Sequence, residues 1–244
     1  MATRVRLAWI GLFALVFVGL AAVSIRAAFP SDAVTHFEPA RLSLLARLGL
    51  TDPLADERSM ALAAFDGRFA GNPVATALHI VAGGLFLLLV PLQLWRRLRS
   101  RHPSVHRVVG RVALGAGLVM VLTALYFGLL MPFAGIGEAV TMALVTAWYA
   151  YATTRAVVAI RRLDVVEHRE WMLRAAAVPL GVATIRIAGL AVELALLERA
   201  LGPRMLFLLS IWSGWALTIG TVEYWIRTTR FVRPVATLER SRAA

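Results

Sequence analysis

The chain consists of long apolar runs separated by short polar segments. Six such runs lie at residues 7–28, 74–95, 108–130, 137–160, 171–196 and 205–226. Each is long enough to cross a bilayer as a helix, because the hydrocarbon core requires about 20 consecutive apolar residues. The period-two alternation of membrane barrel strands is missing from the runs. The pattern therefore predicts an all-α polytopic membrane helix bundle with six transmembrane helices.

The first apolar run follows Arg4 and Arg6, as the apolar part of a secretory signal follows basic residues. It extends over Leu7–Val23, however, whereas a signal peptide has an apolar part of about 7–15 residues. We therefore expect an uncleaved signal-anchor, with cleavage near Ala27–Ala28 as the alternative. The predicted division is a first transmembrane helix (1–28), an outer segment (29–73), a five-helix membrane core (74–227) and a basic cytoplasmic tail (228–244).

The outer segment shows two amphipathic patterns. Leucines at helical spacing follow Pro39, and Gly49 is a natural stop for that helix. Asp52 is expected to cap a second helix, with Pro53 in its first turn. We expect two short helices on the outer face of the bundle. They either pack against the helix ends or form a lid over an outward-facing pocket.

The composition excludes several classes of protein. Hydrophobic residues make up 59% of the chain and charged residues 16%, whereas soluble domains contain about 45–50% apolar and about 25% charged residues. A soluble globular enzyme, a disordered chain and a nucleic-acid-binding module are therefore excluded. The chain has no cysteine and no lysine, which excludes disulfides, thiolate metal sites and Schiff-base chemistry.

The arginines predict the orientation. With the N-terminus in the cytoplasm, inner segments hold 18 arginines and outer segments 7. Basic residues favour the cytoplasmic side, so we expect both termini inside and a multi-pass protein of the bacterial cytoplasmic (inner) membrane. The net charge of +12 is then explained by topology and by attraction to anionic lipid headgroups on the cytoplasmic side, without nucleic acid. Protein partners and homo-oligomers remain open.

Polar residues inside the apolar runs are candidate functional groups, because such residues are costly in hydrocarbon. Arg186 is the most costly of them, since a guanidinium keeps its charge and needs an anion, carbonyls or water. Glu193 lies on the same helical face, and Glu138 and His79 lie at a similar outer level. We predict one outward-facing polar pocket from these four, in which His79 titrates. The alternatives are that Arg186 pairs with Glu193 while His79 bonds a carbonyl, or that His79 ligates a metal or haem.

A second group of candidates opens the third and fifth apolar runs on the cytoplasmic side. The third run opens with His106, Arg107 and Arg111, and the fifth run opens with His168, Arg169, Trp171 and Arg174. Arginines at helix N-termini attract anions such as phosphate headgroups, a carboxylated ligand or haem propionates. One alternative is ordinary anchoring at the membrane surface with Trp171 at the interface. Another is that His106 and His168 ligate one haem between facing helices.

Other spacings predict packing. Small residues four apart predict close helix approach; these pairs are Ala113/Gly117, Ala177/Gly181 and Ser210/Gly214. Pro91 and Pro179 are expected to bend their helices and free carbonyl groups. Glu223 and Arg227, also four apart, are expected to pair.

These motifs together resemble a family of predicted bacterial membrane proteins that is known only as a domain of unknown function. The resemblance extends over about 74–226 and rests on His79, Pro91-Leu92-Gln93, His106-Arg107-x-x-Gly110-Arg111, His168-x-x-Trp171-Met172-x-Arg174 and Arg186. The chain departs from the family pattern at Val90, where glycine is expected, and at Ala113, where an aromatic residue is common. The resemblance implies the membrane architecture and these site residues, and it implies no established activity.

The sequence contains no Walker loop, dinucleotide fingerprint, zinc-helix motif or serine elbow. Our leading hypothesis is a non-hydrolytic membrane protein that binds a small anionic or amphipathic ligand in an intramembrane polar pocket, with a proton linkage through His79. One alternative is a haem- or quinone-dependent redox protein. Another is a structural subunit of a membrane complex.

Overall fold

The computed structural model describes residues 2–196 and 201–229, with side chains from residue 6 onward, and contains no strand in these ranges. The elements are α1 (Ala2–Ala28), the 3₁₀ turn η1 (Thr35–Phe37), α2 (Glu38–Arg47), α3 (Ala55–Ala70), α4 (Pro73–Leu94), α5 (Arg96–Arg101), α6 (Pro103–Leu130), α7 (Ile136–Arg161), α8 (Val165–Leu196) and α9 (Pro203–Thr229). Helices α1, α4, α6, α7, α8 and α9 are long and apolar enough to cross a membrane. The prediction of an all-α bundle with six long spans is confirmed.

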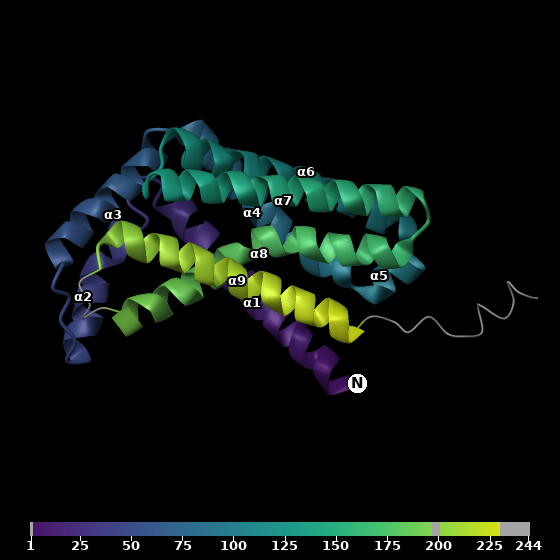
Figure 1. Ribbon diagram of the computed structural model, residues 1–244, viewed down its shortest axis with the longest axis horizontal. Coiled ribbons are helices and arrows are strands. Elements are labelled where there is room, and N and C mark those ends of the chain that lie inside the picture. The colour runs from purple at the N-terminus through teal and green to yellow at the C-terminus, as the bar shows by residue number, and fades with distance from the viewer. Residues whose placement is uncertain (1, 197–200, 230–244) are drawn as a thin grey trace, which may run out of the picture.

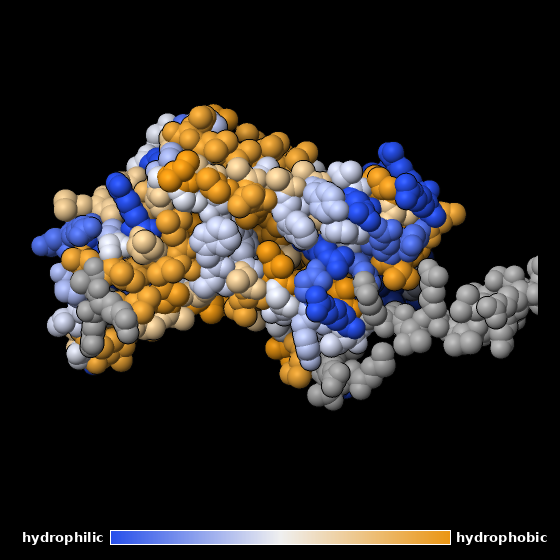
Figure 2. All heavy atoms as spheres, viewed as in Figure 1, coloured by the Kyte–Doolittle hydropathy of each residue, from blue (hydrophilic) through white to orange (hydrophobic). Residues whose placement is uncertain are grey.

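Helix α8 lies at the centre of the bundle, where it packs against α1, α4, α6, α7 and α9. Figure 1 shows α6 and α7 as an antiparallel pair along one side. The start of α1, helix α5 and the end of α9 lie at one end, called here the inner end, and α2 and α3 lie at the opposite, outer end (Figure 1). Figure 2 shows hydrophilic side chains gathered at the inner end and apolar side chains along much of the bundle between the two ends.

The central helices approach closely because their facing residues are small. Ala152 and Ala156 of α7 and Ala183 of α8 are completely buried. Gly214 of α9 has no room for a Cβ atom, because the backbone of Ile185 on α8 occupies that position. Such faces are typical of membrane helices, where close packing replaces the hydrophobic effect. The predicted small-residue contact of α9 is confirmed.

The outer segment packs against the outer ends of the long helices. Three ion pairs hold it there in the described part of the chain: Arg26–Asp66 between α1 and α3 (2.7 Å), Arg68–Glu138 between α3 and α7 (2.8 Å) and Arg41–Glu193 between α2 and α8. Asp66 also accepts the backbone N–H groups of Val34 and Thr35, both at 2.9 Å. Of the two arrangements that the sequence allows for this segment, the structure shows the packed one.

Asp52 does not cap the second outer helix, so that prediction is wrong. Helix α3 begins at Ala55, and Asp52 accepts the N–H group of Leu54 at 3.1 Å. The same carboxylate accepts hydrogen bonds from Arg41 and Arg58, each at 2.8 Å. Two guanidinium groups bind a carboxylate more strongly than a backbone N–H group does, which explains why this side chain joins α2 to α3 and does not cap α3.

Two inner helices begin earlier than the apolar runs predict. Helix α6 begins at Pro103, whose fixed φ suits a first helical position. Asp164 accepts the N–H group of Glu167 at 2.9 Å and so caps the start of α8. These polar turns extend the helices beyond the apolar runs and place His106 and His168 within the first helical turn. The predicted basic tail (228–244) lies outside the described residues except for its first two.

Candidate ligand-binding site

Both carboxylates predicted to line an outward-facing pocket bind arginines of the outer segment. Glu138 is 2% exposed and accepts hydrogen bonds from Arg68 at 2.8 Å and from the N–H group of Ala134 at 2.9 Å. Glu193 accepts a hydrogen bond from Arg41. Neither forms an ion pair with Arg186, so the predicted Arg186–Glu193 pair is not formed.

Arg186 is exposed and donates a hydrogen bond from Nη1 to the carbonyl of Val182, one turn earlier on α8, at 2.9 Å. Within residues 6–196 and 201–229 it forms no ion pair. It lies close enough to His79 and Arg26 for their charges to interact. Of the four residues predicted to form one pocket, His79 and Arg186 lie within electrostatic range of each other, whereas both carboxylates bind the outer segment.

His79 is held by groups on α6. Its Nδ1 atom lies 2.9 Å from the hydroxyl of Thr123 and 3.2 Å from the carbonyl of Met120. The ring also meets Phe127 edge-on, with 6.4 Å between the ring centroids. These contacts agree with the expectation of a carbonyl-bonded histidine, and they leave Nε2 as the ring atom available to a ligand.

The motif at the start of α8 ties that helix to its neighbours. Arg174 donates two hydrogen bonds to Glu223 of α9, and its guanidinium lies over the Trp171 ring at 4.7 Å. Arg155 of α7 also lies over this ring, at 4.9 Å. The expected pair of Glu223 with Arg227 is wrong, because Arg174 engages both oxygens of that carboxylate in bidentate geometry. Trp171 and Arg174 thus join α7, α8 and α9.

The motif histidines lie at helix junctions. Nδ1 of His168 lies 2.9 Å from the carbonyl of Ala156, and since a carbonyl only accepts, Nδ1 donates. Gln93 donates to the backbone carbonyl of His106 at 3.2 Å, and Gly110 leaves room for the Gln93 side chain. The buried Nδ1 atom of His106 has no hydrogen-bond partner among the described residues.

His106 and His168 lie within electrostatic range of each other. A haem held between them stays a prediction. No group of three or more His, Asp or Glu side chains that could hold a metal ion occurs in the described part of the chain. Arg107 and Arg111 are exposed and form no ion pair there.

A cavity of about 400 Å³ lies between the inner halves of α1, α8 and α9. The walls are mostly apolar and include Leu7, Leu12 and Leu15 of α1, Leu173, Ala176 and Leu180 of α8, and Val222 and Trp225 of α9. A cavity of this size and composition is typical of small-molecule sites.

Two arginines from different elements line the inner end of this cavity. Arg99 of α5 donates to the carbonyl of Leu94 at 2.9 Å, and Arg169 of α8 donates to the hydroxyl of Thr229 at 3.1 Å. Burial is the main cause that lowers the pKa of Arg99, and the positive charges of Arg169 and Arg96 lower it further. The lining contains no carboxylate. The charge of Glu170, the next residue on α8, acts on Arg169 from outside the lining. The lining itself presents two cations and no carboxylate to an apolar cavity, an arrangement that favours an anionic group.

Hydroxyl groups line the deep end of the cavity. Thr184 of α8 and Thr218 of α9 are buried and share a hydrogen bond, and Thr221 lies one turn nearer the inner end. One of the two hydroxyls donates to the other, and the other donates to a carbonyl of its own helix, either Thr184 to Gly181 at 3.0 Å or Thr218 to Gly214 at 2.8 Å. Each oxygen keeps a lone pair for a donor on a ligand.

Most of these cavity residues are absent from the sequence-based candidates, which include only Arg169. Arg99 lies among the arginines that set the topology, so its position gave no separate signal. The threonines did carry one, because hydroxyls on facing membrane helices form interhelical bonds. The pairing of α8 with α9 was needed to bring Thr184 to Thr218.

Residues 76–226, more than half of the chain, match the model of a family described as predicted membrane proteins, DUF2306. The chain belongs to this family. The DUF2306 region includes α5, α6, α7 and nearly all of α4, the cavity walls on α8 and α9, and both Arg99 and Arg169. The wall on α1 lies outside it. No curated protein and no solved structure matches the chain.

Proposed function

We propose that this membrane protein binds a small amphipathic anion in the cavity between α1, α8 and α9. The observation that carries the proposal is the pair Arg99 and Arg169 at the inner end of an apolar cavity without a carboxylate. A carboxylate or phosphate group of the ligand binds these guanidinium groups. The apolar body of the ligand lies against leucines, and a polar atom at its far end bonds Thr184 or Thr218.

The route of entry follows from the same geometry. The cavity lies at bilayer depth between spans, and residues of α1, α8 and α9 form its walls. A ligand of the inner leaflet therefore enters laterally between α1 and α9, with its charged group at the level of the arginines. Bilayer entry favours an amphipathic ligand over a fully water-soluble one.

The test uses the full-length protein in detergent and dodecyl phosphate as the probe. Dodecyl phosphate is expected to raise the thermal unfolding temperature, whereas dodecanol, which has the same chain without the charge, is expected to have a much smaller effect. The double variant Arg99→Gln/Arg169→Gln should bind the probe at least about tenfold more weakly, since each charged hydrogen bond contributes about 1.5–3 kcal/mol.

The matched control is Arg161→Gln/Arg162→Gln, which removes the same charge from exposed positions on the same end of the bundle. It should bind dodecyl phosphate as the unmodified protein does. Equal stabilisation by dodecanol, or equal loss of binding in both double variants, would show that the arginine pair is not an anion site. The absorption spectrum of the same preparation tests the redox alternative, because a bis-histidine haem would give a Soret band that disappears in His168→Ala.

The proposed setting is the bacterial cytoplasmic membrane, with both termini inside. The support is the arginine excess in the inner segments and the placement of the start of α1 and the end of α9 at one end (Figure 1). Reporter fusions after residue 229 should report a cytoplasmic location, and reporters inserted at Gly49 should report an outer location. The reverse pattern would overturn this orientation.

A further inference from the structure

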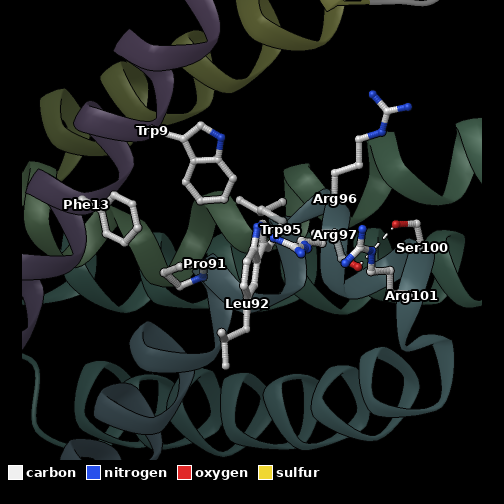
Figure 3. Close-up of a pocket in the computed structure, with 10 residues that line it drawn as sticks. Trp9, Phe13, Pro91, Leu92, Trp95, Arg96, Arg97, Ser100 and Arg101 are labelled. Carbon is white, nitrogen blue, oxygen red and sulfur yellow. Dashed lines mark hydrogen bonds between the residues drawn. The ribbon is translucent and has the colours of Figure 1, made fainter.

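A second and larger hollow lies on the surface, between α1 and the junction of α4 with α5 (Figure 3). Its volume is about 860 Å³. The cavity of the proposed function shares Trp9 and Leu94 with this groove, but it is lined by Arg99 and Arg169, whereas the groove is lined by Arg96, Arg97 and Arg101. The two hollows are therefore neighbours, and the ligand cavity does not explain the second set of arginines.

One end of the groove is apolar. Phe13 of α1 is 56% exposed, and Pro91 and Leu92 of α4 also line the groove. Trp9 stacks on Phe13 with 5.7 Å between the ring centroids. Figure 3 shows Phe13 and Pro91 together at this end. Exposed apolar side chains at bilayer depth lie against acyl chains, so this end suits hydrocarbon.

The other end is strongly basic. Arg97, Ser100 and Arg101 gather there in Figure 3, and Arg96 also lines the groove. None of the three arginines forms an ion pair within the described ranges. The Ser100 hydroxyl donates to the carbonyl of Arg97 at 3.3 Å, which keeps its oxygen free to accept. Three unpaired cations at one end of a groove favour an anionic partner.

The order of groups along the groove matches the cross-section of a lipid leaflet. Trp95, which is 48% exposed, lies between the apolar end and the arginines (Figure 3). Tryptophan is enriched at the level of lipid headgroups, with acyl chains on one side and phosphates on the other. Arginines near the inner surface attract anionic lipids by about 1 kcal/mol each.

We infer that this groove is a binding site for one anionic glycerophospholipid of the inner leaflet. The phosphate binds Arg97 and Arg101, which lie four residues apart on one face of α5, and Trp95 packs against the glycerol region. An acyl chain lies along Leu92, Pro91 and Phe13. A soluble phosphate would gain nothing from the apolar end, and a zwitterionic lipid would present its own cation to the arginines.

The experiment uses the full-length protein in mixed micelles that contain either phosphatidylglycerol or phosphatidylcholine with the same acyl chains. Native mass spectrometry and thermal unfolding measure lipid binding. Phosphatidylglycerol should remain bound and raise the unfolding temperature, whereas phosphatidylcholine should dissociate. The variant Arg97→Gln/Arg101→Gln should bind phosphatidylglycerol about 30-fold more weakly, since it loses two basic residues.

The control is Arg161→Gln/Arg162→Gln, which has the same net charge and should retain full binding. Phe13→Ala keeps every charge and should weaken binding of long-chain phosphatidylglycerol more than that of its dihexanoyl analogue. The proposal is overturned if phosphatidylcholine binds equally, if inorganic phosphate alone gives the same stabilisation, or if both double variants lose binding equally. Binding of dodecyl phosphate in the other cavity should be unchanged in Arg97→Gln/Arg101→Gln, which separates the two sites.

Discussion

Arg68 donates a hydrogen bond to Glu138 at 2.8 Å, and their side chains are only 9% and 2% exposed. The guanidinium also lies over the Phe65 and Phe69 rings, at 4.2 and 4.9 Å. Burial lowers the pKa of Arg68, and the charge of Glu138 opposes that shift. The pair joins α3 of the outer segment to the start of α7, so the outer segment is an integral part of the fold.

Glu138→Gln should therefore destabilise the protein strongly. It leaves the Arg68 charge buried without compensation, which typically costs about 3–5 kcal/mol. The double variant Arg68→Met/Glu138→Leu removes both charges and should cost clearly less than the sum of the two single changes. Unfolding midpoints of the purified proteins in one detergent provide the measurement. Additive losses would show that the two residues do not act as a pair.

The outer segment should also be sensitive to acid. Burial alone would raise the pKa of Asp52, but hydrogen bonds from Arg41 and Arg58 outweigh it and hold the pKa below its ordinary value of 3.8. A carboxyl whose pKa is lowered by folding stabilises the protein above its unfolded pKa and loses that contribution as the pH falls through the folded pKa. Stability should therefore decrease as the pH falls below about 4.

Asp52→Asn tests this dependence, since the amide removes the titration while keeping the shape. It should destabilise the protein at neutral pH by about 1–3 kcal/mol and should show a smaller further loss on acidification. Limited proteolysis between residues 29 and 72, followed from pH 6 to pH 3, reports opening of this segment. If the stability of Asp52→Asn decreased with acidification as much as that of the unmodified protein, another carboxyl group would be responsible.

The sequence alone predicted the long helices because bilayer thickness sets their length, and because a helix satisfies all of its backbone hydrogen bonds internally in lipid. The sequence also predicted the ends of α2 to within two residues, because Gly49 is a helix-stop signal and adopts a positive φ of 71° just after the helix. Where the sequence analysis failed, the competing partner came from a distant helix. Asp52 was expected to cap the start of its own helix, yet it binds the guanidinium groups of Arg41 on α2 and Arg58 on α3.

The candidate site shows the same limit. Motif residues such as Trp171 and Arg174 were identified as site candidates, but their partners on α7 and α9 make them ties between helices. Arg99 belongs to a run of arginines that orients the protein, and no local pattern separates it from Arg96 or Arg97. Only the tertiary arrangement shows which arginine lines which hollow.

The contact of α8 with α9 should not tolerate a side chain at Gly214. A Cβ atom there would overlap the backbone of Ile185, which has no rotamer to change. Gly214→Ala should therefore cost about 1–3 kcal/mol by overpacking. Gly220→Ala on the same helix meets open space and is the matched control, expected to leave stability unchanged or slightly increased. Equal unfolding midpoints for the two variants would contradict this close approach.

Arg186 offers a test of whether the outer half of the bundle is wet. Among the described residues, the Arg186 guanidinium is bonded only to the carbonyl of Val182, so at bilayer depth it needs water or a ligand for its remaining donors. The neighbouring residue Ile187 is also exposed, at the same depth on α8. We therefore expect water to reach Arg186, and we expect the apolar side chain of Ile187 to lie against lipid.

The chain contains no cysteine, so single cysteines report water access directly, because only the thiolate reacts and it forms only in water. Arg186→Cys should react with a membrane-impermeant thiosulfonate added from the outer side, and Ile187→Cys should react at least about tenfold more slowly, since its thiol in lipid stays protonated. A membrane-permeant reagent confirms that both thiols are present. If both cysteines were protected from the impermeant reagent, Arg186 would lie against lipid, and its place in an outward-facing polar pocket with His79 would be wrong.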